Sequence, residues 1–176
     1  MNFRTKNDSF VMISERVSPP LMVDPDLRKL IYEAIEKHLN LPDQVGRNYS
    51  YKQSMDFGRI IGGCACVPVD SESGWFASRR GKRTALPVVF DREKLETSFL
   101  TLTLVKHRFE DLWVVVDFYI GSATPCAPYD RLLQLGSSEY QQSLDFWTSH
   151  ALVYDPETMA EPYESSWEQE LEKLKS

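Results

Sequence analysis

A run of basic residues near the middle of the chain contains the side chains best suited to hold an anion. Residues 78–84 read SRRGKRT. Guanidinium groups present a planar fork of donors that matches phosphate oxygens, and several can converge on one anion. Arg59 lies in an upstream stretch that predicts a strand, and it can join them if the two segments pair. We therefore predict that Arg59, Arg79 and Arg83 bind phosphate; the alternative is a solvated basic turn at Gly81.

Two histidines and a tyrosine are the candidates for catalysis at such a phosphate. Imidazole changes its charge near neutral pH, which suits a general acid or base, so we assign that role to His107 and His150. Tyr119 lies near the end of an apolar, strand-like run, where its hydroxyl can orient a phosphate or donate to an oxyanion. Each has an ordinary alternative: a polar hairpin end for His107, a helix cap for His150 and a turn for Tyr119.

The absence of other motifs excludes several classes of enzyme. No glycine-rich nucleotide loop, G-x-S-x-G elbow or H-E-x-x-H helix is present. The three histidines are too scattered for a metal cluster, and Cys64 and Cys66 have the spacing of one strand face rather than of a zinc site, so we expect no metal and no cofactor. Three cysteines, no apolar leader and no long apolar run predict a cytoplasmic protein without a membrane segment.

Length and charge predict one domain with unevenly distributed charge. The chain has 176 residues and a formal net charge of −6, and this length supports one packed core. Residues 51–108 carry ten basic and six acidic side chains, whereas residues 109–176 carry three and thirteen. We predict a single domain over residues 1–176, with an N-terminal arm over 1–23 and an acidic segment with a terminal helix over 155–176. RNA is a candidate partner for the basic centre.

The hydrophobic pattern predicts an α+β fold. Asp24 followed by Pro25 marks a helix start, and apolar residues at helical spacing continue it to Leu39. A later helix is capped by Ser137 or Ser138. We predict a mostly antiparallel sheet of four to five strands, in which the last two form a hairpin, with an N-terminal helix and C-terminal helices. The strand-like segments are 9–13, 56–69, 74–78, 86–90, 97–107 and 112–120.

Asp117 interrupts the most apolar of these strands. Strict alternation places it on one face with Trp113, Val115 and Tyr119. Because a carboxylate is costly to bury unpaired, we predict that Asp117 pairs with an arginine on a neighbouring strand.

Five stretches occur in a fixed order between residues 55 and 154: FGRIIGGCACVP, FASRRGKR, TLTLVKHR, DLWVVVDFYIGSATPCAPYD and SLDFWTSHALVYD. Together they resemble a family of uncharacterised bacterial proteins of similar length. Its pattern reads F-I-G-x-x-x-P-x-x-P-W-D followed by F-W-x-x-H-A-L-V, and Tyr129 stands here in place of the tryptophan. That family has no established activity, so the resemblance implies bacterial relatives and no function.

A helical start followed by strands reading TLTLVKHR and WVVVDFY is similar to the barnase, EndoU, colicin and RelE-like class of small ribonucleases. That resemblance implies metal-independent cleavage of RNA through its 2′-hydroxyl. Arginines would hold the phosphate, a histidine would move protons and a hydroxyl would orient the scissile group. Here those roles fall on the arginines, histidines and tyrosine named above, with Thr103 as a second candidate hydroxyl. The negative net charge counts against RNA binding.

Two alternatives need no RNA. A noncatalytic protein-interaction or regulatory domain, of the immunity type, would present exposed aromatic side chains and the acidic segment to a protein partner. The aromatic candidates are Trp75, Tyr129, Trp147 and Trp167. A small-molecule enzyme would instead use a pocket between the sheet and the helix that contains Phe146 and Trp147. The sequence leaves these alternatives open, together with the oligomeric state.

Overall fold

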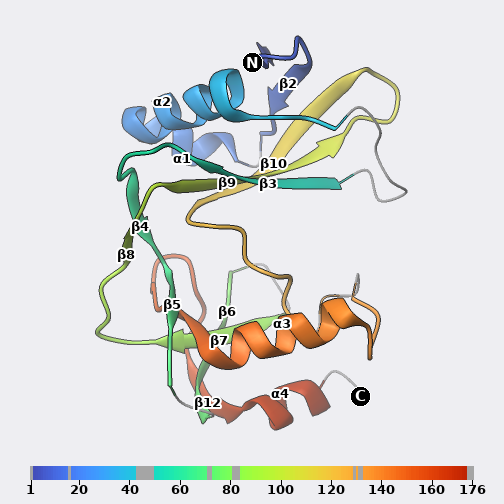
Figure 1. Ribbon diagram of the computed structural model, residues 1–176. Helices are drawn as coiled ribbons and strands as arrows, with labels where there is room; N and C mark the ends of the chain where they lie inside the picture. Colours follow the sequence, from blue (N-terminus) through green and yellow to red (C-terminus); the bar gives the residue numbers. More distant parts are fainter. Residues whose placement is uncertain are drawn as a thin grey trace. The chain divides into compact units, whose positions relative to one another are not determined.

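The chain forms a mixed α+β protein, as predicted, whose elements belong to two compact units (Figure 1). The first unit comprises Met1–Cys64 and Glu96–Ala123, and the second comprises Ala65–Leu95 and Thr124–Ser176. The single domain predicted over residues 1–176 stays a prediction. The structure, a computed structural model, describes residues 2–15, 17–42, 50–70, 73–80, 84–128, 130 and 133–173.

A five-stranded sheet forms the centre of the first unit. Its order is β1-β2-β10-β9-β3; β2 and β10 run parallel, and the other neighbours run antiparallel. The predicted hairpin of β9 and β10 is confirmed, with Trp113 opposite Lys106 and Ile120 opposite Leu100. The strands are β1 (Asn2–Arg4), β2 (Phe10–Ile13), β3 (Ser50–Asp56), β9 (Phe99–Lys106) and β10 (Leu112–Ile120).

Helices pack on one face of this sheet (Figure 1). They are α1 (Ser18–Val23), α2 (Pro25–Glu33) and a π-helical turn, Ala34–His38, that continues α2. Helix α2 begins where predicted, because the Asp24 carboxylate accepts hydrogen bonds from backbone N–H groups of the first turn. Ile31 and Ile35 are fully buried in one apolar core with Leu102 of β9.

A β-bulge in β10 corrects the predicted face of Asp117. The register with β9 shifts between Val115 and Asp117, so Val116 is skipped and the residues after it turn to the opposite face. Trp113 and Val115 are buried in the core, whereas Asp117 lies opposite Thr103 on the other side of the sheet. The neighbour of Asp117 on β9 is therefore a threonine and not the predicted arginine.

The second unit has its own five-stranded sheet, in the order β12-β6-β7-β11-β5, with β7 and β11 parallel and the other neighbours antiparallel. Its two helices are α3 (Ser138–Ser149), capped by Ser137 as predicted, and α4 (Trp167–Glu172). The strands are β5 (Cys66–Pro68), β6 (Ser73–Ser78), β7 (Ala85–Val89), β11 (His150–Val153) and β12 (Tyr163–Ser166).

The prediction of one sheet with four to five strands is wrong. The described residues form two five-stranded sheets and a two-stranded sheet of β4 (Gly62–Cys64) and β8 (Leu95–Thr97), although most strand pairs are antiparallel as predicted. The helices predicted near the N-terminus and after the strands are confirmed. Within the part of the chain that is described, no helix is long and apolar enough to cross a membrane.

Candidate functional site

The residues predicted to bind phosphate and move protons divide between the two units. Arg59, His107 and Tyr119 belong to the first unit, and Arg79 and His150 belong to the second. Arg83 lies outside the described residues. Within each unit, the geometry can be compared with what one phosphate site would require.

Arg59 is held in an ion pair by helix α2. Two guanidinium nitrogens donate to the two carboxylate oxygens of Glu33, at 2.7 and 3.3 Å, and the guanidinium carbon lies 5.4 Å from the centre of the Phe57 ring. The hydrogen bond from Arg59 holds the pKa of Glu33 below its ordinary value, and the same bond raises the pKa of Arg59. This two-point contact engages the fork of donors that a phosphate would use.

Arg59 and His107 lie at opposite ends of β9. Asp56 pairs with Phe99 at the start of this strand and Arg59 follows it, whereas His107 follows Lys106 at the end of the strand. Eight residues of extended chain span about 27 Å, which is far beyond the reach of one arginine side chain. The first unit therefore does not bring these two residues to the same phosphate.

Tyr119 is also distant from His107. It lies opposite Thr101, six residues before His107 and so about 20 Å away along the strand. The Nδ1 atom of His107 is buried and has no hydrogen-bond partner within the described residues, and the ring lies edge-on to Phe109 at the exposed hairpin tip. The first unit thus places no described hydroxyl of the predicted set beside this imidazole.

His150, in the second unit, contacts the last turn of the preceding helix, α3. Its Nδ1 lies 3.0 Å from the Ser149 hydroxyl and 3.0 Å from the carbonyl oxygen of Phe146, and its ring stacks on Phe146 with ring centres 4.1 Å apart. These contacts fit the helix cap that the sequence offered as the alternative. Arg79 forms a β-bridge with Met159 beyond the end of β6, and β7 lies between β6 and the strand that begins with His150.

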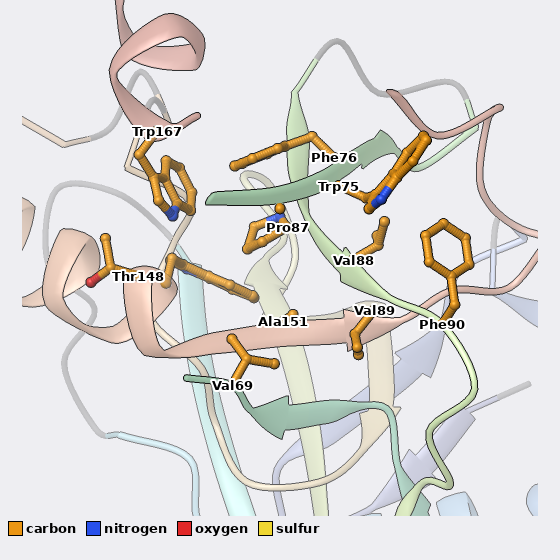
Figure 2. Close-up of a pocket in the computed structure, with 12 residues that line it drawn as sticks. Val69, Trp75, Phe76, Pro87, Val88, Val89, Phe90, Thr148, Ala151 and Trp167 are labelled. Carbon is orange, nitrogen blue, oxygen red and sulfur yellow. The ribbon is translucent and has the colours of Figure 1, made fainter. Parts of the chain in front are cut away.

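An apolar cavity in the second unit is a stronger candidate for a binding site. It measures about 310 Å³ and is lined by residues of β6, β7, β11, α3 and α4 and their flanks (Figure 2). It lies between the sheet and α3, where the sequence offered a pocket as one alternative. Five aromatic side chains line it, with valine, proline and alanine between them: Trp75, Phe76, Phe90, Trp147 and Trp167.

Two of the tryptophans form a fixed wall. Trp147 is 3% exposed, and its indole N–H points at the carbonyl oxygens of Pro125 and Cys126, at 3.3 and 3.2 Å. Trp167 is 8% exposed and packs edge-to-face on Phe76, with ring centres 5.1 Å apart. The interaction alternative would present Trp147 and Trp167 as exposed side chains, and the structure buries both.

Trp75 and Phe90 are accessible from solvent. They are 42% and 36% exposed, and they meet edge-to-face with ring centres 5.6 Å apart. Phe90 in turn contacts Tyr154, at 5.2 Å between ring centres. Trp75 is exposed as predicted, and Tyr129 lies outside the described residues. The cavity is completed by ordinary apolar residues such as Val88 and Phe90. No motif in the sequence marks these residues as part of a binding site.

The chemistry of the lining favours apolar groups. None of the described charged side chains lines the cavity, and the Thr148 hydroxyl already donates to the carbonyl oxygen of Leu144, at 2.9 Å. An anion placed there would lose its hydration without gaining a cationic partner. In the part of the chain that is described, no group of three or more histidine, cysteine, aspartate or glutamate side chains is placed to hold a metal ion.

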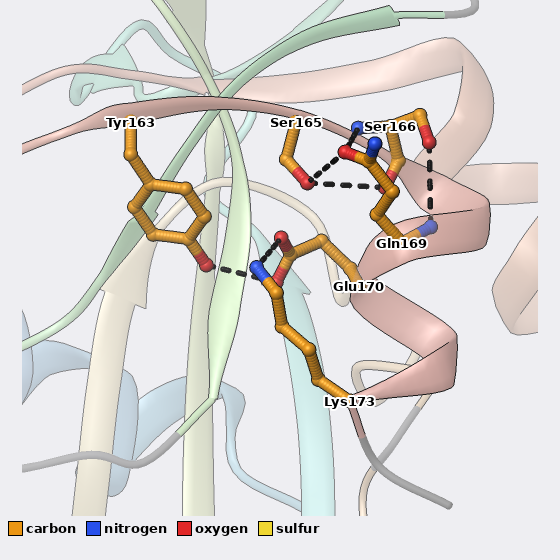
Figure 3. Close-up of polar contacts among 6 residues, drawn as sticks. All are labelled: Tyr163, Ser165, Ser166, Gln169, Glu170 and Lys173. Carbon is orange, nitrogen blue, oxygen red and sulfur yellow. Dashed lines mark hydrogen bonds and ion pairs between the residues drawn. The ribbon is translucent and has the colours of Figure 1, made fainter.

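Polar contacts at the start of α4 position Trp167. The Ser166 side chain accepts a hydrogen bond from the Gln169 N–H, and the Gln169 side chain accepts one from the Ser166 N–H (Figure 3). This reciprocal cap fixes the first helical residue, which is Trp167 itself.

A buried carboxylate secures the same helix to β12. Glu170 is 5% exposed and accepts hydrogen bonds from the Tyr163 hydroxyl, at 2.8 Å, and from Lys173, at 2.7 Å (Figure 3). Burial alone would raise the pKa of Glu170, but the hydrogen bonds outweigh it and hold that pKa below its ordinary value. Burial and the bond to Glu170 raise the pKa of Tyr163.

Comparison with known proteins assigns no family to this arrangement. No family model matches the chain, and no curated protein matches its sequence. The crystal structure of a conserved hypothetical protein from Toxoplasma gondii ME49 is similar at 15% sequence identity and a TM-score of 0.44, over 67% of this chain and 78% of that one.

Proposed function

We propose that this chain is a noncatalytic interaction protein that binds an apolar group of a protein partner in the tryptophan-lined cavity of the second unit. The observation that carries the proposal is the combination of a fixed wall, Trp147 and Trp167, with an accessible mouth, Trp75 and Phe90. Rigid aromatic side chains in a pocket supply large contact area at a small cost in conformational entropy.

Binding fits the two units better than catalysis does. Arg59 already has a carboxylate partner, and the length of β9, about 27 Å, separates Arg59 from His107. His150 bonds to and stacks on Phe146 in the last turn of α3. The ribonuclease hypothesis stays a separate prediction, and the proposal expects intact RNA after incubation with the protein, with or without EDTA. Cleavage lost in the Arg79→Ala and His150→Ala variants at unchanged melting temperature would refute the noncatalytic proposal.

The direct test uses the four tryptophans of the chain as reporters. N-acetyl-phenylalaninamide, a neutral apolar probe, would be titrated into ¹⁵N-labelled protein while the indole N–H signals are recorded. We expect saturable shifts of the signals from Trp75, Trp147 and Trp167. The signal of Trp113 is the internal control, because that side chain is 2% exposed in the core of the first unit.

Two outcomes would overturn the proposal. Shifts of all four signals in parallel would mean nonspecific association, and the absence of saturable shifts at millimolar probe would mean that the cavity does not accept an apolar group. Each indole signal would be assigned with a Trp→Phe variant, so that overlapping signals are not mistaken for parallel shifts.

A further inference from the structure

The acidic C-terminal segment contributes Trp167 to the lining of the cavity and carries an excess of negative charge. Residues 155–173 carry seven acidic side chains and one basic side chain. The basic one, Lys173, is bound to Glu170. The side chains of Glu161, Glu164 and Glu168 are exposed and form no hydrogen bond or ion pair within the described residues. A partner that docks at this end of the unit therefore meets an acidic surface.

The sheet register places one of these carboxylates beside the cavity mouth. Glu164 of β12 lies directly opposite Trp75 of β6, and directly opposed residues of an antiparallel pair share one face. Glu168 follows Trp167, the residue that forms the wall. The carboxylates thus flank the aromatic residues and do not enter the cavity.

Two described arginines of this unit, Arg79 and Arg80, lie beyond the end of β6. Arg79 follows Trp75 by four residues, which is about 13 Å along β6. Arg80 lies beside it, and its guanidinium donates to the carbonyl oxygen of Pro156 at 3.0 Å. Residues 91–94, after Phe90, carry two acidic and two basic side chains and so add no net charge.

We propose that the occupant of the cavity is a basic peptide segment of a protein partner, which inserts one apolar side chain between the tryptophans while its lysine or arginine neighbours face Glu164 and Glu168. This inference rests on the proposed function and adds the charge of the partner to it. Apolar burial supplies the affinity, and the carboxylates at the rim select the sign of the flanking charge. The same rim disfavours nucleic acid, whose phosphates carry the wrong charge.

The test compares three fluorescein-labelled peptides with one apolar centre: GKKFLKKG, GSSFLSSG and GEEFLEEG. Fluorescence anisotropy would give the affinity of each at low salt. We expect the lysine peptide to bind about tenfold more tightly than the serine peptide, and the glutamate peptide to bind most weakly. The advantage of the lysine peptide should shrink at 0.5 M salt, because screening weakens the rim charges.

Two matched variants locate the effect. Glu164→Gln should weaken binding of the lysine peptide about two- to fivefold and leave the serine peptide unchanged. Glu157→Gln makes the same change in net charge, but Glu157 lies in the turn beside Pro156, where Arg80 is bound. It should change neither affinity. Trp75→Ala should weaken both peptides.

The outcomes separate this inference from the proposed function. If the serine peptide binds in a Trp75-dependent manner but the lysine peptide is no tighter, or Glu164→Gln changes nothing, the charge inference is overturned and the cavity function stands. If no peptide binds, both are overturned. Binding of a labelled hexanucleotide RNA that depends on Trp75 would overturn the basic-peptide inference and favour a nucleic-acid ligand.

Discussion

Replacing Trp75 with alanine should separate binding from stability. Complete burial of a large apolar side chain contributes about 3 kcal/mol by transfer from water. Trp75 is 42% exposed and therefore 58% buried, so Trp75→Ala should cost about 2 kcal/mol of unfolding free energy. Water fills the space left at a surface position, so no term for an empty cavity is added. In a chain of this size the melting temperature should fall by about 4–8 °C.

Trp147→Ala is the contrasting substitution. Trp147 is 3% exposed and its indole N–H faces two carbonyl oxygens. Removing the indole therefore loses the transfer free energy of the side chain, leaves an internal cavity and leaves the carbonyl groups without their donor. We expect a cost of about 3–5 kcal/mol. Urea denaturation at 25 °C, followed by tryptophan fluorescence and circular dichroism, would measure both variants.

The Trp75 and Trp147 variants should differ in how far they lose stability and how far they lose affinity for the peptide. Trp75→Ala should remain folded and lose most of its affinity for the serine-flanked peptide. Two results would contradict this expectation. Trp75→Ala could destabilise the protein as much as Trp147→Ala, which would make Trp75 part of the core, or it could bind the peptide with unchanged affinity.

Three further experiments test the contacts that support the two units. Glu170→Gln should lower the free energy of unfolding by about 1–3 kcal/mol near neutral pH. Because the folded state holds the pKa of Glu170 below its ordinary value of 4.5, the stabilisation is complete above that value and is lost as the pH falls through the folded pKa. The urea midpoints of the parent and the variant should therefore converge in acid. A constant difference at every pH would contradict this. A double-mutant cycle of Arg59→Ala and Glu33→Gln, read by urea denaturation, should give a small favourable coupling energy, because solvent screens this ion pair. Zero coupling, with loss of phosphate binding in Arg59→Ala, would instead favour the anion site. Gly121→Ala should lower the melting temperature by several degrees, because Gly121 has a φ of +133° and an added Cβ would lie 2.6 Å from the Sγ of Cys64; an unchanged melting temperature would show that this segment yields.

Elements with strong local signals were predictable from the sequence. Asp24 and Pro25 start α2, Ser137 caps α3, and the apolar run Leu112–Ile120 is β10. Each depends on residues within a few positions of one another, and propensity and capping act at that range.

The unpredicted strands depend on distant partners. Strand β11 begins at His150 directly after α3, and Ala151 continues the helical spacing, so the pattern predicts a longer helix. Its pairing with β5 and β7 takes Ala151 and Leu152 into the sheet. Strand β3 is polar at alternate positions and lies at the edge of its sheet, where a weak apolar pattern suffices.

The candidate site was predictable only in part. Exposed aromatic residues and a pocket beside α3 were among the alternatives. The basic run dominated the prediction, because a cluster of consecutive charged residues can be recognised in the sequence without knowledge of the fold. The bulge at Val116 illustrates the limit: one extra residue turns Asp117 away from the face that alternation assigns to it. Burial and strand register decide which face a side chain occupies and which residues line a cavity, and both depend on the whole fold.

The proposed function requires that an apolar side chain enters the cavity of the second unit. Isotope-filtered nuclear Overhauser spectroscopy of the labelled protein with unlabelled GSSFLSSG peptide tests it directly. We expect cross-peaks between the phenylalanine or leucine protons of the peptide and the indole protons of Trp75 and Trp167. Cross-peaks confined to other exposed apolar residues, such as Phe109 of the first unit, which is 90% exposed, would contradict it.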